Sequence, residues 1–330
     1  MKKNSDLRLS RRHFLSAAAA ATAFPSLVAA QSDWPNRPIK LIASSSPGSS
    51  TDVVSRLIAD GLTQRLGQPV VVETKPGAAG MVAAAEVARA PADGYTFVTI
   101  FGSYAANVTL NPQRTYKDSD LTGVSMVGLY PGLVVAHPSL PKTLAGIVQF
   151  AKANPNALSY SSGGAGTLAH IKMAQWAHLA GIQMTHVPYK GGASAMTDLI
   201  AGRVHMANDT ISIMKPQVEK GTLNAVGVDS AKRHYAVPNV PTFVEQGYPE
   251  CVDDAWTGIV CRSAVPRPII NRMSQEVNAV LKSDKVRTTL MGDSFGMNLQ
   301  DMTPEQTDAF IAKEIKKWGE IIRKLNITAS

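Results

Sequence analysis

Short apolar runs alternate with stretches of helical periodicity along most of the chain. Pro38–Ala43 is a run of strand-forming residues, and within Asp52–Leu66 the apolar residues recur on one face of a helix. Two more strands are predicted at Pro69–Glu73 and, after the turn at Asp93-Gly94, at Thr96–Phe101. The first third of the chain is therefore expected to alternate between strands and helices.

The same alternation continues to the C-terminus. The predicted strands of the middle part are Leu133–Ala136, Leu158–Ser162, Met184–Val187, Arg203–Ala207 and Leu223–Val228. The predicted helices between them are Leu144–Ala153, Thr167–Ala180 and Ala193–Ala201. After the apolar run Trp256–Cys261 the pattern is helical at Ile269–Leu281 and Pro304–Leu325. Thr303, Pro304 and Gln306 are typical of a helix start, at the N-cap, first and third positions.

Alternating strands and helices build mostly parallel sheets that are covered by helices on both faces, so the predicted fold class is α/β. A chain of 330 residues is longer than one such core needs, which predicts two lobes. Parallel sheets bind ligands at the carboxyl ends of their strands. The loops that follow the strands are therefore the first place to search for a site.

The first thirty residues have a different composition from the rest. Basic residues lead into the apolar run Ala17–Phe24, which is too short to span a bilayer, and small residues precede Gln31. This pattern predicts a signal peptide over residues 1–30 that is cleaved after Ala30. Arg11-Arg12 followed by Phe14-Leu15 resembles a twin-arginine export signal, and a general secretory signal is the alternative.

Charge and cysteine content exclude several classes of protein. The chain has 33 Lys and Arg against 25 Asp and Glu. Removal of residues 1–30 takes away five basic residues and one acidic residue, which leaves 28 minus 24, or +4. So small a net charge, without a run of basic residues, predicts no basic surface that would bind nucleic acid. Cys251 and Cys261 lack the spacing of a zinc site, and whether they form a disulfide stays open. No metal and no cofactor are expected.

The first candidate loop lies between the strand Pro38–Ala43 and the following helix. Small residues let a ligand approach the backbone, and the unpaired N–H groups of a first helical turn attract an anion. An ordinary N-cap is the alternative use of these residue types, and Asp52 is expected to cap its own loop. The candidate residues are Ser45, Pro47, Gly48, Ser49, Ser50, Thr51 and Asp52.

The second candidate loop precedes the helix Thr167–Ala180. It matches a variant of the dinucleotide fingerprint, but no acidic residue follows near Thr185–Lys190 to hold a ribose, so a backbone anion site is the remaining prediction. His170, on the first turn, lies either on the wall of the cleft or packed against its lobe. The candidate residues are Ser162, Gly163, Gly164, Ala165, Gly166, Thr167 and His170.

Enzyme signatures are missing from the sequence. It contains no GxSxG or HExxH motif, and its seven histidines are scattered. Ser162 with His170 has no third partner in the sequence pattern, so an exported hydrolase is a weak alternative. The prediction is a protein that is not an enzyme.

Several short motifs together resemble one family, the tripartite tricarboxylate transporter receptors, also called the Bordetella uptake gene proteins. The resemblance covers Trp34 to Leu325. The matching stretches are Trp34–Ile39, Leu66–Glu73, Lys75–Gly80, Asp93–Thr96, His186–Gly191, Val240–Thr242 and Trp256–Gly258.

The resemblance implies a type II periplasmic-binding-protein fold, in which two Rossmann-like lobes are joined by two crossing strands near Leu133–Ala136 and Trp256–Cys261. Lobe 1 is then discontinuous, with residues 31–132 and 260–330, and lobe 2 is residues 133–259. The implied function is a periplasmic, monomeric receptor that captures a small carboxylate for the membrane components of a tripartite tricarboxylate-type transporter. A ligand sensor for a membrane kinase is the alternative that the sequence does not separate from it.

The resemblance also implies how the ligand is held. Backbone amides and water of the two loops bind the carboxylate. By position, Ser103 and Asn107 in the loop after the third strand, Gly192 and Ala193 at a helix start, and Asp209 after a strand of lobe 2 complete the wall. Where the family usually has Phe-Pro-Pro-Gly-Gly, this chain has Ser45-Ser46-Pro47-Gly48-Ser49, which predicts a roomier or more polar pocket.

Overall fold

The structure, a computed structural model, describes residues 34–189, 192–292 and 297–328, with the backbone alone at residues 192–194. The predicted signal peptide, its Arg11-Arg12 pair and the cleavage position after Ala30 lie outside the described residues. No helix in the described part of the chain is long and apolar enough to cross a membrane.

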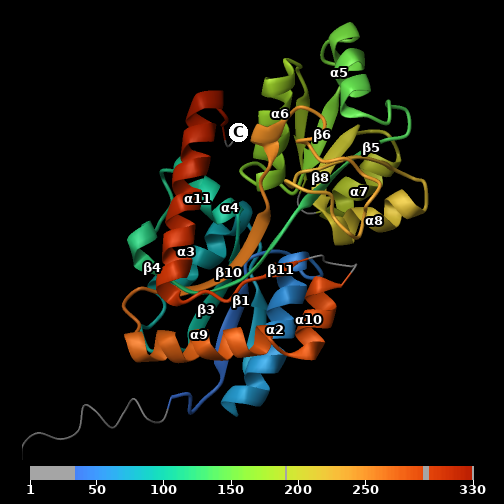
Figure 1. Ribbon diagram of the computed structural model, residues 1–330. Coiled ribbons are helices and arrows are strands. Elements are labelled where there is room, and N and C mark those ends of the chain that lie inside the picture. Colours follow the sequence, from blue (N-terminus) through green and yellow to red (C-terminus); the bar gives the residue numbers. More distant parts are fainter. Residues whose placement is uncertain (1–33, 190–191, 293–296, 329–330) are drawn as a thin grey trace, which may run out of the picture. The chain divides into compact units, whose positions relative to one another are not determined.

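Two mixed β-sheets organise the chain from Arg37 onward, and these residues form one unit (Figure 1). The first sheet has the strand order β11-β4-β10-β3-β1-β2. Its strands are β1 (Ile39–Ala43), β2 (Val70–Thr74), β3 (Thr96–Phe101), β4 (Leu121–Tyr130), β10 (Ala255–Arg262) and β11 (Asn298–Leu299). Two groups of helices cover its two faces (Figure 1). They are α2 (Ser50–Leu66), α9 (Arg267–Leu281) and α10 (Asp284–Met291) on one face, and α3 (Met81–Arg89), α4 (Ser103–Leu110) and α11 (Pro304–Leu325) on the other.

The second sheet has the strand order β7-β6-β8-β5-β9. Its strands are β5 (Gly132–Ala136), β6 (Ser159–Ser162), β7 (Thr185–Pro188), β8 (Met206–Thr210) and β9 (Asn224–Val228). The helices α5 (Leu144–Ala153) and α6 (Leu168–Ala180) pack on one face, and α7 (Gly192–Ile200) and α8 (Ile211–Glu219) on the other. Short 3-10 turns lie at Ala78–Gly80, Asp118–Asp120 and Pro249–Cys251.

The prediction of mostly parallel sheets was wrong. β1 is parallel to β2 and β3, and β6 is parallel to β7 and β8. However, β10 is antiparallel to both of its neighbours, and so is β5. The reason is that the chain enters these two strands from the other sheet, so they are not joined to their neighbours by the right-handed crossovers that make strands parallel.

Side chains on successive residues of β8 point to opposite faces of the second sheet. Met206 packs in the core under α5 and α6, whereas Ala207 packs in the core under α7 and α8. The same alternation assigns Asn208 to the first of these faces and Asp209 to the second. Trp256 and Trp318 are fully buried in the core of the first sheet.

The two cysteines are buried free thiols, which settles the disulfide that the sequence left open. Cys251 belongs to the core of the second sheet and Cys261 to a strand of the first. Burial raises the pKa of both thiols to about 12. Neither thiol is therefore a nucleophile near neutral pH.

The chain passes between the sheets at two places. A single residue separates Tyr130, the end of β4, from Gly132, the start of β5. The chain returns between Val228, the end of β9, and Ala255, the start of β10. Residues 255–262 pair along their whole length within the first sheet. The boundaries predicted for the two lobes stay a prediction.

A buried lysine of α6 connects the two segments by which the chain passes between the sheets. Lys172 Nζ donates to Asp229 Oδ2 at 2.9 Å and also to the carbonyl of Asp253. Asp229 in turn accepts from the backbone N–H of Gly132 and from Asn208 Nδ2. Burial alone lowers the pKa of Lys172, but the carboxylates of Asp229 and Asp253 outweigh it and raise the pKa above its ordinary value. The ammonium group is therefore charged and is hydrogen-bonded to Asp229 and to the backbone of Asp253.

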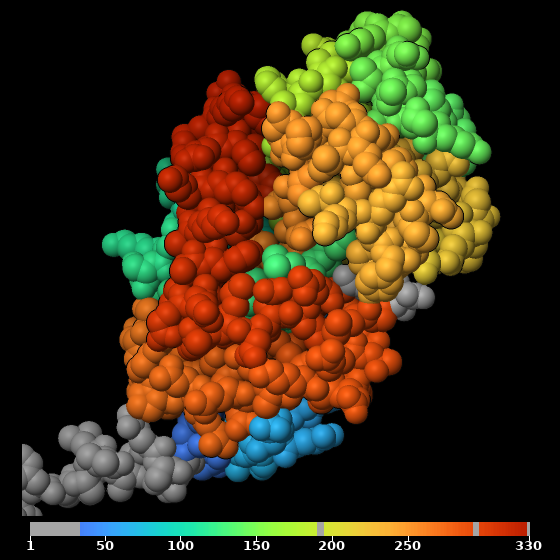
Figure 2. All heavy atoms as spheres, viewed as in Figure 1, coloured from blue at the N-terminus to red at the C-terminus, as the bar shows by residue number. Residues whose placement is uncertain are grey.

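The same network reaches the C-terminal helix. Lys317 of α11 pairs with Asp253 and, at 2.6 Å, with Glu314. Glu314 Oε2 accepts from the indole N–H groups of Trp256 and Trp318 at 3.1 and 3.2 Å. In Figure 2, α11 (red) lies against the orange segment that returns from the second sheet. Charges and indoles thus connect α6, both passages and the first sheet.

Lys172→Met is expected to lower the free energy of unfolding by about 3–5 kcal/mol, because it leaves the buried carboxylate of Asp229 without its cation. Urea unfolding followed by circular dichroism measures the change. Lys282→Met is the control, because Lys282 is 63% exposed and its ion pair with Asp301 contributes little. Equal midpoints for the two variants would show that the buried ion pair contributes no more than a surface one.

Candidate functional site

The first candidate loop lies at the carboxyl end of β1 and leads into α2. Ser49 is the N-cap of α2, and its hydroxyl accepts from the N–H of Asp52. The hydroxyls of Ser45 and Ser49 are 2.6 Å apart. This loop is therefore rich in hydroxyls, and the roomier or more polar pocket expected from the departure stays a prediction.

Asp52 caps its own loop, as the sequence predicts. Its Oδ2 accepts from the backbone N–H of Gly48 at 2.9 Å, and its Oδ1 forms an ion pair with Arg56 at 3.0 Å. Pro47 and Gly48 are exposed. Because Arg56 compensates the charge, Asp52 offers little repulsion to an anion at this helix start.

The second candidate loop follows β6 and leads into α6. Thr167 is the N-cap of α6, and its hydroxyl accepts from His170 N and donates to Gly164 O. Gly166 has a positive φ of 79° and lies so close to Asn107 that an added Cβ would be 2.7 Å from Asn107 Oδ1. Glycine at this position is therefore required twice, by backbone conformation and by space.

Three aromatic side chains stack beneath the second loop. The rings of His170 and His186 are 3.9 Å apart and nearly parallel, and Tyr160 stacks on His186 at 5.0 Å. His170 is only 7% exposed, and its Nδ1 accepts from the N–H of Gly166. His170 thus takes the packed position, one of the two that the sequence left open.

A serine and a histidine meet at the end of β6. Ser162 Oγ lies 2.7 Å from His186 Nε2 and 2.9 Å from the carbonyl of Gly164. Burial, and then the neighbouring His170, lower the pKa of His186 to about 4, so the imidazole is neutral near pH 7. Among the described residues, no carboxylate bonds to the other ring nitrogen of His186. Sequence reasoning missed this pair, because only the pairing of β6 with β7 brings the two residues together.

Ser103 and Asn107 were predicted in a loop, and this was wrong. Both belong to α4, where each is 1% exposed. Asn107 Nδ2 donates to the carbonyl of Gly166 at 3.2 Å, and Ser103 Oγ accepts from the N–H of Leu168 at 3.1 Å. The two side chains therefore hold the second loop against the first sheet's helices.

Asp209 was predicted after a strand, but it lies within β8, which extends to Thr210. Its Oδ1 accepts from the N–H of Thr210 at 2.7 Å. Gly192 and Ala193 are the first two residues of α7, and their side-chain environment lies outside the described part of the chain.

Contacts run in a closed circuit through both candidate loops. The Ser50 hydroxyl, at the start of α2, is 3.3 Å from that of Thr210, at the end of β8. β8 pairs with β6, which leads to the second loop, and Gly166 of that loop contacts Asn107 of α4. α4 follows β3, which pairs with β1, and β1 leads back to the first loop. The two helix starts thus lie on one boundary between the sheets.

Several backbone donors on this circuit have no acceptor. Within the described ranges, no hydrogen bond is formed by the N–H groups of Ser50, Thr51, Gly163, Ala165 and Ala169. The remaining N–H groups of the second loop are taken, for example that of Leu168 by Ser103. The loop is therefore a smaller donor set than its sequence suggests.

A small cavity lies at the carboxyl ends of β6 and β8. Its volume is about 20 Å³. The lining includes Ser162, Gly163, Met196, Asn208 and Asp209. One water molecule needs about 10–15 Å³ of such space, so this cavity, whose lining comes from the second sheet and its helices alone, does not itself hold a dicarboxylate.

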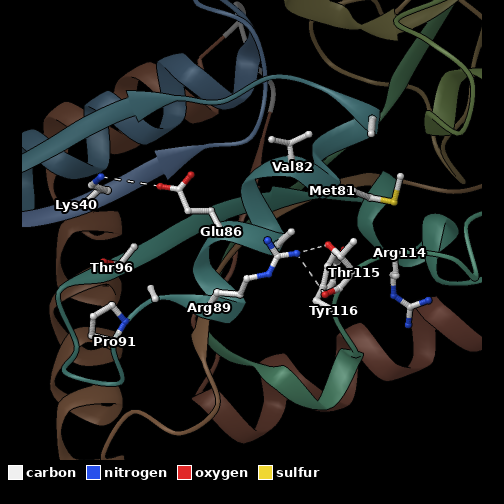
Figure 3. A pocket seen from close by; sticks show the side chains of 13 residues that line it. Lys40, Met81, Val82, Glu86, Arg89, Pro91, Thr96, Arg114, Thr115 and Tyr116 are labelled. Carbon is white, nitrogen blue, oxygen red and sulfur yellow. Dashed lines mark hydrogen bonds and ion pairs between the residues drawn. The ribbon is translucent and has the colours of Figure 1, made fainter.

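A larger hollow of about 860 Å³ lies elsewhere, beside α3 and the amino ends of β1 and β3 (Figure 3). Its charged groups have partners within the lining: Lys40 faces Glu86, and Arg89 donates to the hydroxyl of Thr115. Because α/β sheets bind ligands at the opposite ends of their strands, the candidate site is the circuit of the two loops. Among the described residues, no group of three or more His, Cys, Asp or Glu side chains could hold a metal ion.

Known proteins resemble this chain over almost its whole length. Residues 54–327 match the sequence model of the tripartite tricarboxylate transporter family receptor. The chain therefore belongs to that family. Protein BugT of Bordetella pertussis is 33% identical to this family member over 295 residues, which are 88% of this chain and 90% of BugT.

Solved structures show the same fold. Rpa4515 of R. palustris with adipate has a TM-score of 0.83 at 30% identity and covers 90% of this chain and 99% of its own. MatC from Rhodopseudomonas palustris with bound malate has a TM-score of 0.79 at 28% identity and covers 88% of this chain and all of its own. These likenesses confirm the predicted fold class, the type II periplasmic-binding-protein fold of this receptor family.

His186 is expected to make stability fall in acid. Its pKa is about 4 in the folded chain against an ordinary 6.5, so between these values only the unfolded chain binds the proton and unfolding becomes easier as pH falls. From about pH 7 to about pH 4.5, wild type should lose about 1 kcal/mol more unfolding free energy than His186→Gln, since solvent around the partly exposed ring reduces the effect; urea unfolding measures it. His178→Gln, on the exposed side of α6, should behave as wild type. An unchanged pH dependence in His186→Gln would contradict the depressed pKa.

Proposed function

We propose that this receptor captures a small carboxylate between the starts of α2 and α6. The five unpaired N–H groups of Ser50, Thr51, Gly163, Ala165 and Ala169 carry the proposal, because they lie on one circuit that joins both sheets. Such groups at helix starts attract anions without a charged side chain. The adipate and malate in two related structures support a carboxylate as the ligand.

The donor set is large enough for useful affinity. A hydrogen bond to a charged group contributes roughly 1.5–3 kcal/mol net, and micromolar binding needs about 8 kcal/mol. Micromolar binding therefore needs about three to six such bonds, and the five unpaired N–H groups fall within this range. The proposed wall includes the residues expected from the sequence in the two loops, apart from the packed His170, together with Gly192, Ala193 and Asp209.

Binding requires movement of the two lobes, for which we keep the division into residues 31–132 with 260–330 and residues 133–259. The unpaired donors come from both lobes, Ser50 and Thr51 from the first and those of the second loop from the other, so the ligand enters when the lobes separate. The contact that must open between the starts of α2 and α8 is a weak one between the hydroxyls of Ser50 and Thr210. The ligand then bridges the lobes and favours the closed arrangement.

The proposed setting is the periplasm, reached by the predicted twin-arginine signal. There the monomeric receptor delivers its ligand to the membrane components of a tripartite tricarboxylate-type transporter. A sensor that reports to a membrane kinase would use the same site. Deletion of the gene distinguishes the two roles, because lost uptake supports delivery, whereas intact uptake with lost induction supports sensing.

Hydrolysis is a second candidate only because Ser162 and His186 are hydrogen-bonded. The geometry argues against it in two ways. With a pKa of about 4, His186 is a weak base. In addition, the described residues place no carboxylate on its second ring nitrogen to orient it. The pair is better suited to fixing the second loop.

Carboxylic acids, but not their amides, are expected to raise the melting temperature of the mature protein. A ligand at about 100 times its Kd adds about 2.7 kcal/mol to the unfolding free energy, which corresponds to several degrees. A thermal-shift screen of mono-, di- and tricarboxylates, including aromatic acids, measures it. A neutral compound that shifts the melting temperature where every acid fails would overturn the carboxylate assignment.

Wild type is expected to show no ester hydrolysis above background. Ser162→Ala is therefore expected to change ligand affinity but not the rate of ester hydrolysis. Release of p-nitrophenol from p-nitrophenyl acetate and butyrate measures turnover, and isothermal titration measures affinity. Turnover by wild type that disappears in Ser162→Ala would instead support the hydrolase.

A further inference from the structure

One carboxylate stands on the wall of the proposed anion site without a cation. Asp209 lines the small cavity together with Ser162 and Gly163, at the carboxyl ends of neighbouring strands. The alternation along β8 directs it to the face of α7 and α8, away from Lys172, which lies on α6. Among the described residues, no Lys, Arg or His pairs with this carboxylate.

Only one of its two oxygens is used. Oδ1 accepts from the N–H of Thr210 at 2.7 Å, and no donor in the described part of the chain reaches Oδ2. This differs from Asp52, the other acidic residue of the site, whose oxygens contact Gly48 and Arg56. Asp209 therefore presents an unused acceptor at the cavity wall.

The protonation state of Asp209 makes this acceptor unfavourable for a bare carboxylate ligand. Burial raises its pKa to about 6, although the hydrogen bond from Thr210 lowers it. Near pH 7.5 the group is thus ionised and cannot donate a proton in a hydrogen bond. A ligand carboxylate beside it would be repelled, whereas a hydroxyl or amino group would donate to it.

We propose that Asp209 selects carboxylic acids that carry a hydroxyl or amino group, by accepting a hydrogen bond from that group while the backbone donors of the two loops bind the carboxylate. This inference rests on the proposed function and narrows its ligand class. A site that hydrogen-bonds a ligand group discriminates strongly against the analogue that lacks it, because a bound analogue shields the acceptor from water and leaves it unpaired.

Matched ligand sets test the selection by isothermal titration near pH 7.5. The sets differ only in the donor group. They are succinate with malate and aspartate, tricarballylate with citrate, and phenylacetate with mandelate. Wild type is expected to bind the donor-bearing member of its preferred set at least about tenfold more tightly than the member without a donor. Malate against aspartate shows whether the donor is a hydroxyl or an amino group.

The variant Asp209→Asn tests the role of this side chain more directly than wild type alone does. Its amide oxygen can keep the bond from Thr210 N–H, so its NH₂ group, a donor, faces the cavity in place of an acceptor. The variant is expected to lose the preference and to bind the plain acid more tightly than wild type does. Glu219→Gln, with a side chain that is 64% exposed at the end of α8, should keep the wild-type preference.

The outcomes separate this inference from the function on which it rests. Equal affinities of wild type within each set, or a preference that survives in Asp209→Asn, would overturn the role of Asp209 and leave a carboxylate receptor. Failure of every acid to bind wild type would overturn both. Loss of the preference in Asp209→Asn with an unchanged melting temperature of the free protein supports the selection.

Discussion

The buried ammonium group of Lys172 is the constraint on which the arrangement of the two sheets depends. At 7% exposure it must be neutralised, and it is neutralised by Asp229 and Asp253, which belong to the segment that returns from the second sheet. Asp229 also holds Gly132, at the other passage. The start of α6, and with it the second loop, is thereby fixed relative to both passages.

The end of β8 shows how one strand divides several tasks among adjacent residues. Asn208 bonds to Asp229 in the buried charge network, Asp209 lines the cavity, and Thr210 contacts Ser50 of the other sheet's helix. Because side chains alternate between the faces of a sheet, neighbours in sequence reach different environments. The position of the strand's last residues thus couples the passages, the proposed site and its mouth.

Local patterns in the sequence predicted the parts of the fold that local forces define. The helices Leu144–Ala153 and Pro304–Leu325 match their predicted bounds, because each begins at a threonine cap. α4 was missed because its first residues are buried on all sides and so show no apolar stripe. Both candidate loops were found from their small residues. Contacts between distant parts of the chain were not predicted. Lys172 and Asp229, for example, are 57 positions apart, and only the tertiary fold pairs them.

The small size of the cavity beside Asp209 has a kinetic consequence. It has room for little more than water, so every ligand that is to reach Asp209 must wait for the same opening motion of this wall before it can enter. The observed association rates of different acids would then approach the same limit at high concentration, which is the rate of the opening motion. Acids of different affinity would differ in their residence times. Selectivity among acids in such a molecule lies in their dissociation rates.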